Sequence, residues 1–102
     1  MEKRLGVIAV LIQDTHHIDQ MNAILSDYGH SIIGRLGVPI REKKLNIISL
    51  IVEGTTDELG ALTGKIGRLP GIQVKSVLTH YREAVDQIEL IGTDPRKTNP
   101  KE

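Results

Sequence analysis

The sequence contains one pattern that occurs twice. Residues 5–15 align with residues 45–55 at a shift of 40 positions, with apolar residues mostly opposite apolar ones. After each run, apolar residues recur at spacings of 3, 4 and 3, which places them on one face of a helix. They are Ile18, Met21, Leu25 and Tyr28 in the first copy and Leu59, Leu62, Ile66 and Leu69 in the second. A repeated strand–helix–strand unit in a chain of 102 residues is compatible with very few architectures.

The order of the predicted elements defines the fold class. We expect strands over 4–13, 31–41, 45–53 and 72–79, with a helix following the first and the third strand. This β-α-β-β-α-β order predicts an α+β, ferredoxin-like sandwich, in which a four-stranded antiparallel sheet carries both helices on one face. Right-handed crossovers then place the first and third strands at the centre. The predicted domain spans residues 1–79.

The predicted helix ends have specific signals. Asp14 or Thr15 can cap the first helix with a side-chain oxygen, and Gly29 can end it in the left-handed conformation. The second helix begins at a capping box, Thr-x-x-Glu at 55–58, and Pro70 with the glycine after it stops the helix.

The second strand has the features of an edge strand. Gly34, Gly37 and Pro39 interrupt it, and such residues are costly in a central strand. We therefore expect this strand to be bent or bulged. The charged residues 41–44 that follow it predict a hairpin turn into the third strand.

Composition excludes several classes of function. The 13 basic side chains balance the 13 acidic ones, so no global field attracts nucleic acid or an anionic membrane. The chain has no cysteine, which excludes disulfides and thiolate metal sites, and its two tyrosines are its only aromatic rings apart from histidine. The longest apolar runs, 5–12 and 47–52, are less than half a membrane span. We expect a cytoplasmic protein that neither associates with a membrane nor binds nucleic acid directly.

The C-terminal part differs from the repeated part. Residues 80–92 could form a short amphipathic helix with Tyr81, Ala84 or Val85, and Ile88 on one side. Residues 93–102 contain two of the four prolines and otherwise only polar or charged residues, so they are predicted to form a disordered tail.

Both faces of the central strands are apolar. We assign the even positions to the helix side: Ile8, Val10, Ile12, Ile48, Leu50 and Val52. The odd positions then need a cover, because leaving several aliphatic side chains in water forfeits several kcal/mol. These are Val7, Ala9, Leu11, Ile47, Ser49 and Ile51. A second copy of the sheet or the 80–92 segment could supply the cover, and a partly wet face is the alternative. We expect a homo-oligomer, either a dimer or a tetramer.

Three glycines lie on one side of the second predicted helix. Gly60, Gly64 and Gly67 fall opposite its apolar stripe. Glycine inside a helix costs up to about 1 kcal/mol relative to alanine. The three residues therefore form either a smooth strip for close contact with a partner or a loosely held helix.

A polar turn follows the first strand. Asp14, Thr15, His16 and His17 lie at a predicted helix N-terminus, where a small anion or an amino-acid-like ligand could bind. Gly34 and Arg35 of an adjoining strand could complete the lining, and simple helix capping is the alternative reading. No pair of histidines has metal-ligand spacing on one element, so we predict no metal site within one chain, while metal binding across an oligomer interface stays open. No nucleophile comes with a base and an orienting acid, so we predict no catalytic residue. The sequence does not indicate whether the chain binds a cofactor, or which one.

Several segments together resemble one small family. They are 4–8, 28–29, 32–39, 45–50, 62–72 and 74–77, and the stretch Thr-Gly-Lys-Ile-Gly-Arg-Leu-Pro-Gly within 62–72 is the most specific. This pattern resembles the iron-only hydrogenase system regulators, ACT-like domains related to the effector domain of the nickel-responsive repressor. The resemblance covers residues 4–79 and implies oligomerisation through the sheet and a regulatory role in hydrogenase maturation or expression.

Two departures distinguish this chain from related domains. Many amino-acid-binding ACT domains have a glycine in the first strand–helix turn, where this chain has Asp14 to His17. The nickel repressor uses a cysteine with histidines and a separate DNA-binding segment, and neither is found here.

Three functional hypotheses follow. The first is a non-enzymatic regulatory domain that senses a small molecule or metal at an oligomer interface and acts on a partner protein. The second is a ligand-free oligomeric interaction module. An enzyme is a third reading, which the missing nucleophile–base pair disfavours.

Overall fold

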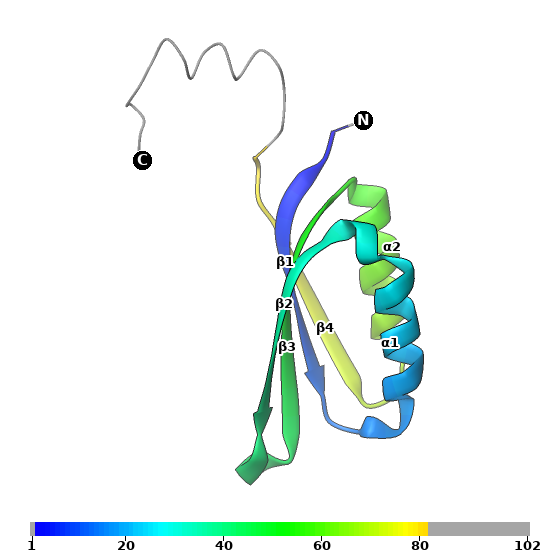
Figure 1. Ribbon diagram of the computed structural model, residues 1–102, viewed down its shortest axis with the longest axis vertical. Coiled ribbons are helices and arrows are strands. Elements are labelled where there is room, and N and C mark those ends of the chain that lie inside the picture. Colours follow the sequence, from blue (N-terminus) through cyan, green and yellow to red (C-terminus); the bar gives the residue numbers. More distant parts are fainter. Residues whose placement is uncertain (1, 82–102) are drawn as a thin grey trace, which may run out of the picture.

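A computed structural model describes residues 2–81 and shows a two-layer sandwich (Figure 1). The strands are β1 (Arg4–Ile12), β2 (Ile32–Ile40), β3 (Leu45–Gly54) and β4 (Ile72–Leu78), and the helices are α1 (Ile18–Asp27) and α2 (Thr56–Gly67). All neighbouring strands are antiparallel, in the order β2-β3-β1-β4, and both helices lie on one side of the sheet. The ferredoxin-like α+β fold and the central place of β1 and β3 are therefore confirmed. The predicted tail over 93–102, and all of the predicted 80–92 helix except its first two residues, fall outside the described residues.

The helix-facing side of the sheet forms the core. The residues predicted for this side, at even positions of β1 and β3, are all buried, and they contact the apolar stripes of both helices. The core consists of Ile8, Val10, Ile12, Met21, Leu25, Ile48, Leu50, Val52, Leu59, Leu62, Ile66 and Ile72. Apart from Met21, it consists of isoleucine, leucine and valine, and it contains no aromatic residue. The assignment of faces from the sequence is confirmed.

Strand β2 lies at the edge of the sheet and contains the expected irregularity. Its pairing with β3 shifts register between Ile32 and Gly34, so Ile33 is an extra residue in the ladder. The hairpin that follows is a 3-10 turn at Arg41–Lys43, closed by Lys44 in the left-handed conformation. Glycine and proline are tolerated here because one side of an edge strand needs no ladder partner.

The helix ends agree with the sequence only in part. Thr55 and Glu58 form the predicted capping box: the Glu58 N–H donates to Thr55 Oγ1 at 3.1 Å, and the Thr55 N–H donates to Glu58 Oε1 at 3.0 Å. Asp14 caps a short 3-10 turn at Thr15–His17, immediately before α1.

The prediction that Gly29 ends α1 in the left-handed conformation is wrong. Among the described residues, Gly71 is the glycine with positive φ. After α1, the chain instead continues into a second 3-10 turn, Gly29–Ser31, in which the Ser31 N–H donates to the Tyr28 carbonyl at 2.9 Å. This tight turn satisfies the exposed carbonyl and leads directly into β2, so no left-handed residue is needed.

Candidate functional site

A concave surface lies between α1 and β2. Because β2 lies at the edge of the sheet, its helix-facing side chains and one flank of α1 form two walls that leave an open space. Two adjoining hollows of about 390 and 370 Å³ share Asn22 and Arg35, so they form one continuous surface. Volumes of this size are typical of small-molecule sites. We call this surface the α1–β2 groove.

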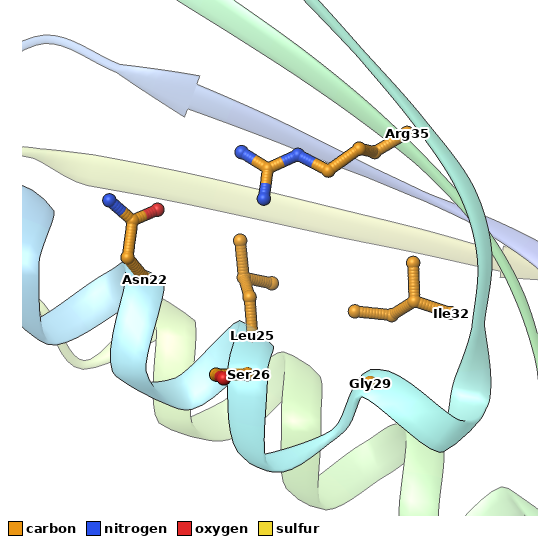
Figure 2. A pocket seen from close by; sticks show the side chains of 6 residues that line it. All are labelled: Asn22, Leu25, Ser26, Gly29, Ile32 and Arg35. Carbon is orange, nitrogen blue, oxygen red and sulfur yellow. The ribbon is translucent and has the colours of Figure 1, made fainter.

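The first hollow combines a polar rim with an apolar floor. Asn22 and Ser26 are four residues apart on α1, so they lie on the same flank of the helix. Leu25 and Ile32 form the floor. Figure 2 shows Arg35 extending from β2 across the space above Leu25, with its guanidinium on the side of Asn22.

The second hollow continues toward the end of β1. Its lining is mainly apolar and consists of Ile12, Ile18, Met21, Asn22, Arg35, Gly37, Pro39, Asn46 and Ile48. It also includes the pair Val38 and Ile47, which alternates with the helix-side pair Gly37 and Ile48 and belongs to the other face of the sheet. A Cβ built on Gly37 would come no closer than 3.9 Å to Ile48 Cγ1. The missing side chain at Gly37 therefore leaves space that a larger residue could fill without a clash.

The groove carries a single formal charge. None of the residues that line either hollow is acidic, and Arg35 is the one basic residue among them. Within residues 2–81, no hydrogen bond or ion pair holds the Arg35 guanidinium, and the side chain is exposed. An unpaired guanidinium beside an apolar floor favours an anionic group on a ligand.

A β-bulge determines the direction of Arg35. Ile32 lies opposite Val52 on the helix side, and a regular strand would place Arg35 on the other face. The extra residue at Ile33 reverses this, because Arg35 lies opposite the buried Leu50. Side chains directly opposite each other point to the same face of a sheet. The bulge therefore places the only charge of the groove inside it.

The β1–α1 turn is a separate polar site. Asp14 Oδ1 accepts a hydrogen bond from the His16 N–H at 3.0 Å and lies 2.5 Å from His16 Nδ1. The His16 backbone N–H, followed by the His16 ring, holds the pKa of Asp14 below its ordinary value. Thr15 and His16 are exposed. His17 Nδ1 is buried and has no hydrogen-bond partner within the described part of the chain.

The structure distributes the six predicted ligand residues over three places. Arg35 is in the groove, Gly34 lies opposite Ile51 on the outer face of the sheet, and residues 14–17 form the turn beyond β1. Asn46 of β3 pairs with both Pro39 of β2 and Ile12, the last residue of β1. Arg35 precedes Pro39 by four residues, so it lies about 13 Å along the strand direction from the end of β1. Within one protomer these residues do not form one site.

Sequence reasoning missed Asn22 and Ser26, which line the groove with Arg35. Their spacing of four on the flank of the apolar stripe of α1 is a signal that could have identified them. It also missed a contact between the helices, where Lys65 Nζ lies 5.3 Å from the centre of the Tyr28 ring. That ring stacks on His30 at 6.4 Å, and His30 Nε2 lies 3.8 Å from Glu58 Oε2.

The predicted oligomer surface lies on the outer face of the sheet, away from the helices. Six large apolar side chains on this face are between 39% and 69% exposed: Val7, Leu36, Val38, Ile47, Ile51 and Val77. They are adjacent in the ladder, since Val7 lies opposite both Ile51 and Val77. Ala9 and Ser49 pair in the next row, and Leu11 and Ile47 in the row after that. We call these residues the outer face.

The three glycines of α2 differ in their surroundings. A Cβ on Gly60 would meet nothing within 4 Å, and one on Gly64 would meet only Arg68 Nη2 at 4.0 Å. A Cβ on Gly67 would lie 2.9 Å from Val74 Cγ1. Gly67 thus allows α2 to approach β4, while Gly60 and Gly64 leave a smooth surface.

Within the part of the chain that the structure describes, no group of three or more histidine, cysteine or acidic residues could hold a metal ion. No helix in residues 2–81 is long and apolar enough to cross a membrane.

A βαββαβ sandwich with this strand order is the fold of ACT-like domains. The ACT domain of the GTP pyrophosphokinase of Chlorobium tepidum is similar, with a TM-score of 0.62 at 18% identity, over 74% of this chain and 99% of that one. The C-terminal domain of the MgtC protein from Mycobacterium tuberculosis has a TM-score of 0.60 at 12% identity, over 79% of this chain and 93% of that one. At these identities the likeness concerns the fold.

The chain belongs to the TM1266-like family, described as "Iron-only hydrogenase system regulator, putative", whose model matches residues 4–76. The solved structure of the uncharacterized protein TM1266 from Thermotoga maritima is 32% identical, with a TM-score of 0.71, over 74% of this chain and 96% of that one. No curated protein matches the chain. The family resemblance drawn from the sequence is confirmed.

Proposed function

We propose that this chain is a non-enzymatic regulatory domain of an iron-only hydrogenase system, which self-associates through the outer face and senses a small molecule or metal. The family description supports the regulatory role. The observation that carries the self-association is the contiguous apolar surface of the outer face on β1, β2 and β3, extended by Val77 of β4. Gln73 and Lys75 of β4, opposite Leu11 and Ala9, form a polar margin on the same side. We place the domain in the cytoplasm, in accord with its hydrogenase link.

The size of the outer face suits a partner sheet. Four strands at about 4.8 Å and nine residues at about 3.3 Å give a surface of roughly 19 by 30 Å. This is the order of a standard interface, which buries about 800 Å² on each partner. Covering one half-exposed aliphatic side chain contributes about 1 kcal/mol. Covering all six apolar side chains would therefore favour a stable dimer or tetramer.

Light scattering coupled to gel filtration tests the self-association. We expect the unmodified chain to elute as a dimer or tetramer, and the double variant Val7→Lys, Ile51→Lys to elute as a folded monomer. These two residues lie opposite each other at the centre of the outer face, so two lysines there would meet like charges from the second copy. Asp19→Lys, on the exposed surface of α1, is the control. A monomer for the unmodified chain at every accessible concentration would overturn this part.

Calorimetry tests the sensing role. The panel is amino acids, nucleotides, aliphatic acids and divalent metals, each titrated into the oligomer. We expect at least one class of compound to give a saturable binding isotherm. If no compound of the panel binds, the sensing role is refuted.

A gene deletion tests the link to the hydrogenase. Deleting the gene should change hydrogenase level or activity in the cell. An unchanged hydrogenase would remove the regulatory link.

The alternative, a ligand-free interaction module, is favoured by the open surface at Gly60 and Gly64. Neither position has a close neighbour that a side chain would meet, so Gly64→Leu should fold normally and block a partner at this surface. Ala61→Leu, on the same helix and also exposed, is the matched control. Partner binding that both variants retain would exclude this surface.

A further inference from the structure

We propose that the α1–β2 groove binds a monocarboxylate with a medium-length aliphatic chain, whose carboxylate pairs with Arg35 and whose chain follows the groove toward Pro39. This inference deepens the proposed sensing role and rests on it, because it assigns the ligand class and the place.

The head group follows from the charge of the groove. Arg35 offers a planar fork of donors that matches a carboxylate with two parallel hydrogen bonds. Its guanidinium has no hydrogen-bond or ion-pair partner in residues 2–81, and neither hollow contains an acidic residue that would compete for it. Asn22 and Ser26 face the same hollow and can donate to the remaining lone pairs of the carboxylate.

The aliphatic chain of the proposed ligand is inferred from the apolar floor of the groove. From the row of Arg35 to the row of Pro39 the strand advances four residues, or about 13 Å. Leu25, Met21 and Ile18 accompany this path along α1. Met21 and Leu25 are already buried in the core, so an aliphatic chain lying lengthwise would cover mainly the half-buried Ile18 and the exposed Pro39. Gly37 leaves the chain room on the strand side.

The same lining disfavours an amino acid. An α-ammonium group beside the carboxylate would lie next to the guanidinium of Arg35, and the groove has no carboxylate to pair with it. Two positive charges on neighbouring groups repel each other, and no acidic side chain in the lining offsets that repulsion. The groove should therefore prefer a simple carboxylate to the amino acid of equal chain length.

Three probes of equal chain length test the head group. Octanoate is the anion, 2-aminooctanoate the zwitterion and 1-octanol the neutral compound. In calorimetry and amide-shift titrations of the full chain, we expect octanoate to bind most tightly. The amide shifts should move at Asn22, Ser26 and Arg35. Tighter binding of 2-aminooctanoate or 1-octanol would overturn the proposal. Shifts confined to the outer face, at Val7 and Ile51, would overturn it as well.

Two variants test the position. Arg35→Gln should weaken the binding of octanoate by at least about tenfold, because a charge-assisted hydrogen bond is lost. Arg35→Lys keeps the positive charge and should retain part of the affinity. Arg41→Gln, an exposed arginine in the β2–β3 turn, is the control and should leave affinity unchanged. Gly37→Leu should fill the second hollow and shorten the longest acid that binds. Equal affinity for the Arg35 and Arg41 variants would overturn the proposal.

The outcomes separate this proposal from the broader one. If octanoate fails to bind while another class in the calorimetric panel does, sensing stands and the ligand class is wrong. If the Val7→Lys, Ile51→Lys variant is monomeric and still binds octanoate with Arg35-dependent affinity, the groove works without the assembled oligomer.

Discussion

The carbonyl oxygen of Gly71 accepts backbone hydrogen bonds from Gln13 at 2.7 Å and from Asp14 at 3.2 Å, and the Asp14 side chain lies directly over the bare Cα of Gly71. A Cβ on Gly71 would clash with Asp14 Cβ. This contact joins the turn before β4 to the turn that follows β1. It fixes the place where α1 begins, and with it one end of the α1–β2 groove.

Replacing Gly71 should be costly for this reason. Gly71 has φ +76, and the left-handed conformation costs an L-residue about 1–2 kcal/mol before any clash is counted. We therefore expect Gly71→Ala to lower the free energy of unfolding by more than about 2 kcal/mol. Urea denaturation measures the change. Gly29→Ala is the control, since nothing lies within 4 Å of its Cβ position, and equal losses for the two variants would contradict the prediction.

The glycines of α2 should respond in opposite directions. Gly60→Ala removes a poor helix former at an open position and should raise the free energy of unfolding by up to about 1 kcal/mol. Gly67→Ala forces a Cβ against the stiff side chain of Val74 and should lower it by about 1–3 kcal/mol. Thermal unfolding of both variants checks the prediction. A stabilised Gly67→Ala protein would show that α2 is free to move away from β4.

Glu58 should make stability depend on pH in the acidic range. The Thr55 backbone N–H holds the pKa of Glu58 below its ordinary value, and His30 and Lys3 act in the same direction. Because the folded pKa is lower than the unfolded one, the carboxylate stabilises the fold above the unfolded pKa. That contribution is lost in the acidic window that begins at the ordinary glutamate pKa of 4.5 and extends down through the folded pKa.

Glu58→Gln provides the test of this pH dependence. Its amide oxygen can still accept from Thr55, but it does not titrate, so the advantage of the unmodified chain over the variant should shrink as pH falls through that window. Denaturant midpoints measured from pH 7 downward give the comparison. Asp14 is present in both proteins, so its contribution cancels in the comparison. An advantage that stays constant over the window would argue against the capping-box carboxylate.

Neighbouring residues of β1 should have very different roles. Ile8 is fully buried, so Ile8→Ala should cost about 2–5 kcal/mol at any protein concentration. Val7 is 40% exposed on the outer face, so Val7→Ala should have little effect on a dilute protein. At higher concentration, where self-association contributes to stability, the loss should grow. Melting curves at two concentrations measure both effects, and a Val7→Ala effect independent of concentration would count against self-association.

Much of the fold could be predicted because it depends on local patterns. The spacing of Met21 and Leu25, and of Leu62 and Ile66, identifies a helix face without any knowledge of the sheet. The capping box at Thr55 is a contact between residues three apart, and the structure contains it as predicted. The left-handed glycine was placed wrongly, at Gly29, because the conformation of a turn depends on the elements it joins. Gly71 takes that conformation, where it faces Asp14 across the turn.

The candidate site could be predicted only in part. Arg35 was named from the sequence, but its grouping with residues 14–17 assumed that an adjoining strand brings them together. The register of β2 on β3 places Arg35 in a different row and with different neighbours, Asn22 and Ser26 of α1. These three residues meet only after the chain has folded, since no sequence spacing links a strand edge to a helix flank.

By itself, the sequence determined the order of elements, the buried face of β1 and β3, and the family, because these depend on the periodicity and the local motifs of the chain. Only the tertiary structure decided which side of the sheet Arg35 faces. The extra residue at Ile33 shifts the alternation of β2 by one position, and such a shift sends every following side chain to the opposite face. A bulge is defined by pairing with a neighbouring strand, so the charge of the α1–β2 groove is a property of the assembled sheet.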